Sequence, residues 1–120
     1  MENKFDFIRN LESLILVVAG LIHAIFLLFF VDLASTSTQL YGGAMFFGVA
    51  YLFFGILIWR KVSIALPIAL FINVLGMIGA IVMFDTSPSK MIDPFLIVID
   101  FISIPLLIYL NINRKKYLSS

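Results

Sequence analysis

The sequence predicts an all-α membrane protein: four transmembrane helices in an up-down-up-down antiparallel bundle, with both termini cytoplasmic. Of its 120 residues, 62% are hydrophobic and 12% are charged, which is more apolar surface than a soluble domain of this size can bury. The apolar residues fall into four long stretches with short polar segments between them. Short connections of this kind favour antiparallel neighbours.

The basic residues indicate the orientation. Lys90 alone lies on one side of the four stretches, whereas seven basic residues lie on the other: Lys4, Arg9, Arg60, Lys61, Arg114, Lys115 and Lys116. Cytoplasmic segments carry the excess of Lys and Arg in membrane proteins, so we expect the cell membrane with both termini inside.

The first predicted helix covers residues 11–31. Its 18 uncharged residues, 14–31, exceed the apolar core of a signal peptide and are long enough to span a bilayer. We therefore expect an uncleaved helix, followed by an outside loop at residues 34–39.

The second and third predicted helices form a hairpin. Residues 41–59 begin at a Tyr-Gly-Gly segment and end at Trp59, an aromatic belt residue that two basic residues follow. The turn at 60–63 is so short that the third helix, residues 64–84, must run back beside the second. Pro67 falls in its first turn, where a missing N–H costs little.

The fourth predicted helix covers residues 94–111, after a polar break at 85–90. Asp93 is expected as the N-cap and Pro94 at the first helical position. Pro105 should kink this helix. Nothing outside the four stretches is long enough for a second core, so residues 1–120 form one domain.

Small residues four apart mark predicted helix contacts, because lipid offers no hydrophobic drive for association and close backbone approach must supply it. These pairs are Gly20 with Ala24, Ala44 with Gly48, and Gly76 with Ala80.

Polar residues within the helices are the candidate functional residues: Asp100, His23, Asn73, Tyr51 and Ser103. Counting from the predicted outside ends puts all but Asp100 roughly 14–17 Å deep, near the middle of the bilayer, and Asp100 at about 9 Å. An intramembrane aspartate costs about 2.5–3.5 kcal/mol and usually marks a functional site. Asp100 is either a carboxylate that carries protons or cations, or a hydrogen-bonded tie between helices, and His23 is a candidate partner.

Several classes of chemistry are not expected. The chain has no cysteine and one histidine, so neither a thiolate site nor an intrachain metal site with two or three strong ligands is predicted. No catalytic motif or cofactor motif stands out, and a formal net charge of +1 predicts no nucleic acid partner. We expect no cofactor and no catalytic activity of the chain alone.

Two families offer a comparison of size and helix number. Small multidrug resistance transporters carry an essential glutamate within their first helix, whereas here that helix carries His23 and Glu12 stands at its cytoplasmic edge. The segment Gly20-Leu21-Ile22-His23-Ala24, residues 43–52 and the aspartate of the fourth helix look similar instead to small archaeal four-helix membrane proteins. Among these, the chain resembles the small helical accessory subunit of archaeal ammonia monooxygenase, which implies a partner complex that holds the copper chemistry elsewhere.

Two functions therefore follow as hypotheses. The first is a non-catalytic accessory or assembly subunit of a larger integral membrane complex, for example a copper-dependent membrane monooxygenase. Its partners would be the lipid bilayer and other membrane subunits. The alternative is a small homo-oligomeric transporter or proton/ion conduit that uses the Asp100 and His23 pair.

Overall fold

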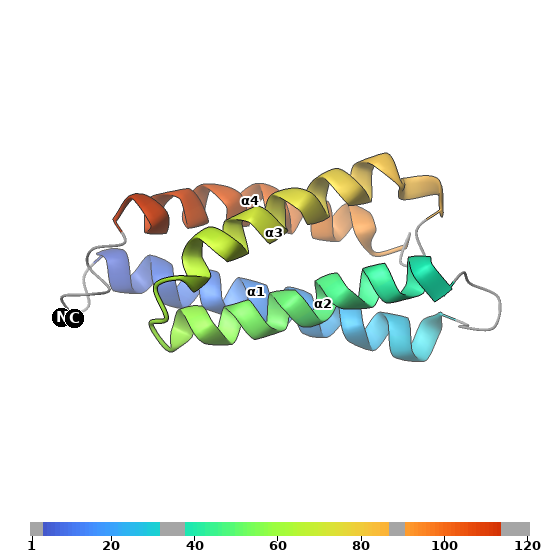
Figure 1. Cartoon of the computed structure of the whole chain (residues 1–120), viewed down its shortest axis with the longest axis horizontal. Helices are drawn as coiled ribbons and strands as arrows, with labels where there is room; N and C mark the ends of the chain where they lie inside the picture. The colour runs from blue at the N-terminus through green and yellow to red at the C-terminus, as the bar shows by residue number, and fades with distance from the viewer. Residues whose placement is uncertain (1–3, 32–37, 87–90, 114–120) are drawn as a thin grey trace.

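Four α-helices run lengthwise through the molecule in the computed structural model, which describes residues 4–31, 38–86 and 91–113 (Figure 1). They are α1 (Lys4–Phe30), α2 (Thr38–Trp59), α3 (Ala65–Val82) and α4 (Asp93–Ile112), and a short 3-10 helix, η2 (Phe84–Thr86), follows α3. The described residues contain no strand. Each α-helix is long and apolar enough to cross a membrane, which confirms the predicted all-α, four-helix membrane protein.

The helices form two closely packed pairs. In Figure 1, α1 and α2 make the lower pair, and α3 and α4 make the upper pair. Contacts of α1 with α4 and of α2 with α3 close the ring. The start of α1, the α2–α3 connection and the end of α4 lie at one end of the bundle, here called the charged end because it carries Lys4, Arg9 and Arg60. The opposite end is called the loop end.

The first helix begins earlier than expected, at Lys4 rather than near residue 11. Its first turns are amphipathic and not uniformly apolar, so a prediction from the length of apolar stretches does not include them. Phe5 and Arg9 are buried, while Phe7 is exposed, and Arg9 pairs with Asp6 one turn away at 3.2 Å. At 27 residues, α1 is longer than the roughly 20 residues that a bilayer core requires.

The other helix boundaries differ from the predictions by smaller amounts. The second helix begins at Thr38, within the predicted loop, and the third ends at Val82 before the 3-10 turn. The N-cap of α4 is Ile92, and the cap makes no side-chain hydrogen bond, so the expectation of an Asp93 cap is wrong. Asp93 is the first helical residue and is turned inward, with 3% of its surface exposed. The remainder of the two predicted outside loops, residues 34–37 and 87–90, lies outside the described residues.

The tight turn between α2 and α3 places one residue in a left-handed conformation. Lys61 has a φ of 64°, which favours glycine over residues with a side chain. The hydrogen bond from Val62 N to Leu57 O, at 3.0 Å, closes the end of α2 just before the chain reverses.

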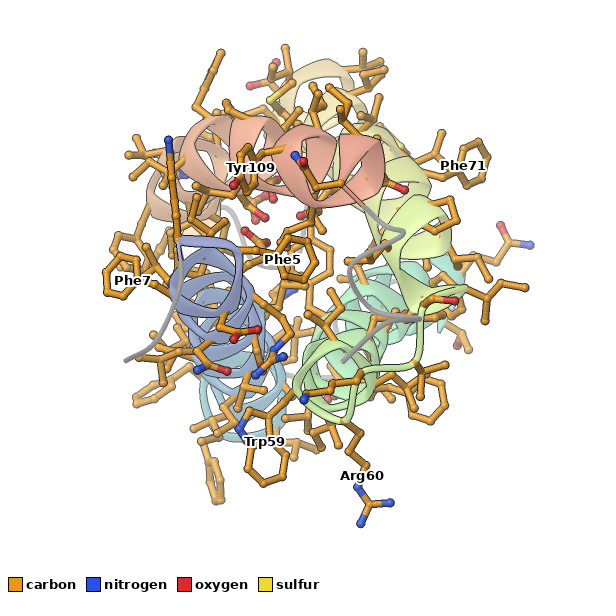
Figure 2. All side chains as sticks on the ribbon, turned by 90° about the vertical axis from the view of Figure 1, so that its left-hand side faces the viewer. Phe5, Phe7, Trp59, Arg60, Phe71 and Tyr109 are labelled. Atoms are coloured by element: carbon orange, nitrogen blue, oxygen red, sulfur yellow. The ribbon has the colours of Figure 1, made fainter. Side chains whose placement is uncertain are left out.

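Buried residues recur at alternating spacings of three and four, the pattern of a coiled-coil seam. In α4 this seam comprises Asp93, Leu96, Asp100, Ser103, Leu107 and Leu110. Phe5 and Tyr109 point into the bundle at the charged end, and Phe7, Phe71 and Trp59 point outward (Figure 2). The interior is therefore narrow, and several of its positions hold polar residues.

Glycines allow the helix pair α1–α2 to approach closely. A Cβ on Gly20 would lie 2.6 Å from Gly48 O and 2.6 Å from Leu52 N, so only glycine fits there without separating the helices. A Cβ on Gly48 would meet Ala24 N at 3.3 Å. The predicted pairs on the first two helices thus meet at a single contact, although Ala44 lines a cavity.

Candidate functional site

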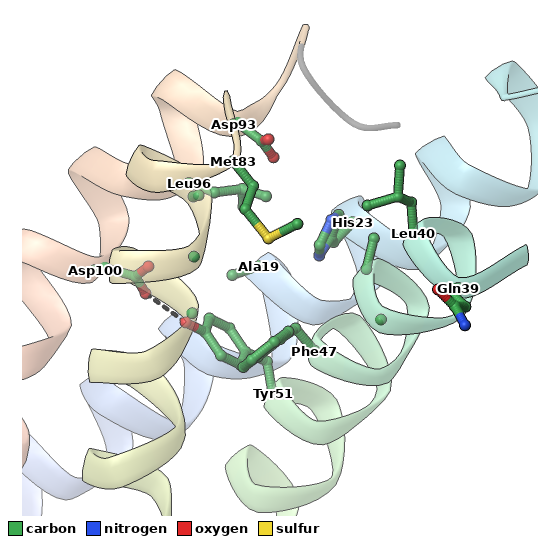
Figure 3. Close-up of a pocket in the computed structure, with 15 residues that line it drawn as sticks. Ala19, His23, Gln39, Leu40, Phe47, Tyr51, Met83, Asp93, Leu96 and Asp100 are labelled. Carbon is green, nitrogen blue, oxygen red and sulfur yellow. Dashed lines mark hydrogen bonds between the residues drawn. The ribbon is translucent and has the colours of Figure 1, made fainter. Parts of the chain in front are cut away.

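A cavity of about 240 Å³ lies between the four helices, in the half of the bundle nearer the loop end. Gln39, Met83 and Asp93 lie at its outer part, and Tyr51 and Asp100 lie deepest, as Figure 3 shows. Its wall is mostly small or apolar, with residues that include Ala19, Ala44, Phe47, Gly76, Ala80 and Leu96. Drug-sized ligands usually occupy roughly 300–1,000 Å³, so this cavity suits a smaller molecule or ion.

The floor of the cavity is a hydrogen-bonded pair from two helices. Tyr51 of α2 donates its hydroxyl to Oδ1 of Asp100 in α4, at 2.7 Å (Figure 3). Asp100 is 3% exposed and Tyr51 is 8% exposed. Gly76 of α3 makes room for this pair, because a Cβ there would lie 2.7 Å from the Tyr51 hydroxyl. Three helices therefore cooperate to hold one carboxylate at a fixed position.

His23 and Asp93 lie on opposite sides of the outer cavity, on α1 and α4 (Figure 3). Asp93 is the acidic group whose charge acts on the imidazole. Tyr51 donates the hydrogen bond at Asp100, and the charge of Asp93 acts on His23. A direct pair of His23 with Asp100 stays a prediction.

A second buried carboxylate lies below the cavity floor. Ser103 of α4 donates its hydroxyl to Oε1 of Glu12 in α1, and neither residue has any exposed surface. Asp100 is close enough to act on Glu12 electrostatically. Asn73 of α3 is 1% exposed, and neither polar atom of its side chain has a hydrogen-bond partner among the described residues.

The candidate polar residues are thus distributed along the bundle. Asp100, Tyr51 and His23 line the cavity, whereas Ser103 and Asn73 are buried outside its lining. Gly76 and Ala80, a predicted small-residue pair, also line the cavity, and Gly76 is in close contact with the Tyr51 hydroxyl.

Glu12 is a site residue that the sequence did not predict: it was expected at the membrane edge, without a role, and is fully buried in the bundle. The spacing of the first helix carried a signal that was not used: residues 5, 9, 12, 16, 19, 23 and 27 follow the same three-and-four pattern as the seam of α4. Glu12 and His23 share this face, so an inward glutamate was predictable once the helix was extended to Lys4.

The cavity combines an apolar wall with acidic side chains. Within residues 4–31, 38–86 and 91–113, no group of three or more His, Cys, Asp or Glu side chains could hold a metal ion. The cavity instead presents two acidic side chains, Asp93 and Asp100, in an apolar wall. A positive charge there would offset the cost of a buried carboxylate.

Comparison with known proteins found no matching family, no matching curated protein and no matching solved structure. The resemblance to the accessory subunit of archaeal ammonia monooxygenase therefore stays a prediction.

Proposed function

We propose that this chain is a small membrane carrier or conduit for a small cation, with Asp100 as the carboxylate that holds the cation or proton in transit. The observation that carries the proposal is the position of Asp100: it is oriented by Tyr51 at the floor of a cavity within a membrane-spanning bundle. A carboxylate at this depth is costly to keep charged, so a passing cation gains from neutralising it.

The structural role of Asp100 as a tie between α2 and α4 fits the same hydrogen bond. The cavity favours transport over the tie, because a tie requires no space beside the carboxylate. Gly79, Ala80 and Ala44 leave that space open in a bundle that packs closely elsewhere, as at Gly20.

Reconstituted vesicles test this function. Wild-type protein should conduct or exchange protons or Na⁺ under an imposed membrane potential, and Asp100→Asn should abolish the flux while the protein stays folded, since the amide keeps the shape of the carboxylate. Asp85→Asn removes an exposed carboxylate near the end of α3 and should leave the flux intact. Equal flux in wild type and Asp100→Asn would exclude this role for Asp100.

The orientation proposed for transport follows the charge distribution: the charged end faces the cytoplasm and the loop end faces outside, in the cell membrane. Cysteines placed at Thr38 and Lys61 of this cysteine-free chain test it with a membrane-impermeant thiol reagent. Labelling of the Lys61 position from outside, with protection of the Thr38 position, would reverse the assignment.

An accessory subunit of a larger membrane complex remains the second candidate. The specific observation in its favour is at Gly42, which is exposed outside the cavity lining and where a Cβ would meet no other atom of the described residues within 4 Å. A helix of another membrane protein could approach the α2 backbone there. Mass spectrometry of gentle detergent extracts tests this candidate, and recovery of the chain free of other subunits in every mild detergent would count against it.

A further inference from the structure

We propose that Glu12 and Asp100 form an inner site for one small monovalent cation, Na⁺ or a proton, below the cavity floor. Oxygen atoms of Ser103 and Asn73 complete the site. The inference deepens the proposed function and rests on it for the role of the site, but binding at Glu12 can be measured without any transport.

The first step is the level of each residue along the bundle. Ser103 and Asp100 lie three residues apart on α4, so their levels differ by about 4.5 Å. Glu12 shares the level of Ser103 through their hydrogen bond. Asn111 of α4 donates its Nδ2 to Leu66 O of α3 at 3.1 Å, so these two residues share a level. The two helices are antiparallel, so moving seven residues forward along α3 and seven residues back along α4 brings Asn73 to within one residue of the level of Ser103.

The second step is the unfilled bonding capacity at that level. Glu12 Oε2 and both polar atoms of the Asn73 side chain are buried without a hydrogen-bond partner among the described residues. Buried polar atoms are nearly always paired, since leaving one unpaired costs about 1–3 kcal/mol. A carboxylate oxygen and an amide oxygen in such a place are ligands for a hard cation or partners for an acidic proton.

The third step is charge. The negative charge of Asp100, on α4, acts on Glu12. On α2, Tyr51 is the titratable group on which the charge of Glu12 acts. On its own helix, Arg9 is engaged by Asp6 and Asn10. Two neighbouring carboxylates in a dry interior cannot both stay ionised without a cation between them. One bound Na⁺ or one proton relieves this repulsion.

The site also lies between the cavity and the charged end. Ser13, next to Glu12, donates its hydroxyl to Gly55 O at 2.7 Å, and Arg60 lies five residues beyond Gly55, or about 7.5 Å. Glu12 is therefore the next carboxylate that a cation would meet on its way from Asp100 to the charged end.

Thermal unfolding of the purified full chain tests the proposal, because a ligand that binds only the native state raises the unfolding temperature. Unfolding is compared in equal concentrations of sodium chloride and choline chloride, at neutral and mildly acidic pH. A higher unfolding temperature in sodium assigns the site to Na⁺, and a rise on acidification in choline alone assigns it to the proton. Glu12→Gln should lose the response, and Asp85→Asn should retain it.

Two further measurements keep the test decisive if Glu12→Gln folds poorly. In Asn73→Leu the response should weaken, whereas a higher stability with an unchanged response would show that Asn73 takes no part. In the wild type, a hydrophobic carbodiimide should modify the protonated Glu12 carboxyl, and Na⁺ should protect it if Na⁺ binds. A wild-type chain that responds to neither cation, or a Glu12→Gln variant with the full response, would overturn the inner site even if Asp100 proves essential for flux.

Discussion

Replacing Gly76 by alanine should disturb the Tyr51–Asp100 pair, whereas the same replacement at Gly79 should not. Both glycines lie on α3 and line the same cavity. A Cβ at Gly76 would stand 2.7 Å from the Tyr51 hydroxyl and 3.3 Å from Phe47 Cδ1, but a Cβ at Gly79 would meet nothing within 4 Å. The pair of variants therefore adds the same methyl group to the same helix and differs in what that group touches.

The expected magnitude follows from these contacts. Both variants gain the higher helix propensity of alanine, about 1 kcal/mol, and this gain cancels in the comparison. In Gly76→Ala the hydroxyl must shift by several tenths of an ångström, which lengthens a 2.7 Å hydrogen bond. Interhelical hydrogen bonds in membranes contribute about 0.6–1.7 kcal/mol, and crowding a packed position costs about 1–3 kcal/mol. Gly76→Ala should thus be less stable than Gly79→Ala by about 1–3 kcal/mol.

The assay is reversible unfolding of both variants in mixed detergent micelles, followed by circular dichroism. Cation flux in vesicles is measured in parallel and should fall in Gly76→Ala alone. Equal free energies of unfolding, within about 0.5 kcal/mol, together with equal flux would refute the assignment of the Tyr51–Asp100 pair as an element of the site.

Three other stability predictions concern the helix contacts and the turn. Gly20→Ala should destabilise the bundle by about 1–3 kcal/mol, because its Cβ meets the α2 backbone at 2.6 Å. Gly43→Ala, with open space around the Cβ, should be neutral or stabilising. Equal unfolding free energies for the two variants would disprove the close α1–α2 contact. Lys61→Gly should stabilise the α2–α3 turn by about 1 kcal/mol by relieving a φ of 64°, and a loss of stability would argue against the left-handed conformation. Ser13→Ala should lose about 0.6–1.7 kcal/mol with its hydrogen bond to α2, and an unchanged unfolding transition would indicate that this bond contributes nothing.

The long apolar stretches were sufficient to predict four membrane helices, because a span is defined by length and composition alone. The start of α1 was harder to predict, since residues 4–10 are amphipathic and their hydrophobic face becomes visible only through the spacing of Phe5 and Arg9.

The candidate site was predictable only in part. Asp100 stood out because an aspartate in an apolar stretch is costly, but its partner depends on how the helices are rotated about their axes, which single-helix patterns leave open. His23 lay at a plausible depth, and yet Tyr51 is the residue that the packing turns toward Asp100. Glu12 was set aside for its place near the membrane edge, although the direction in which it faces decides its burial.

Thiol labelling can show directly whether the cavity attracts positive charge because of Asp100. Ala44→Cys places a thiol in the cavity wall of this cysteine-free chain, and Thr38→Cys places one at the exposed start of the same helix, outside the cavity lining. Small cationic and anionic methanethiosulfonate reagents of similar size are compared at each position from the loop side. The cationic reagent should be favoured more strongly at Ala44→Cys than at Thr38→Cys, and adding Asp100→Asn should remove most of this preference. Equal preference at the two positions, or a preference that Asp100→Asn leaves unchanged, would contradict a cation site at the cavity floor.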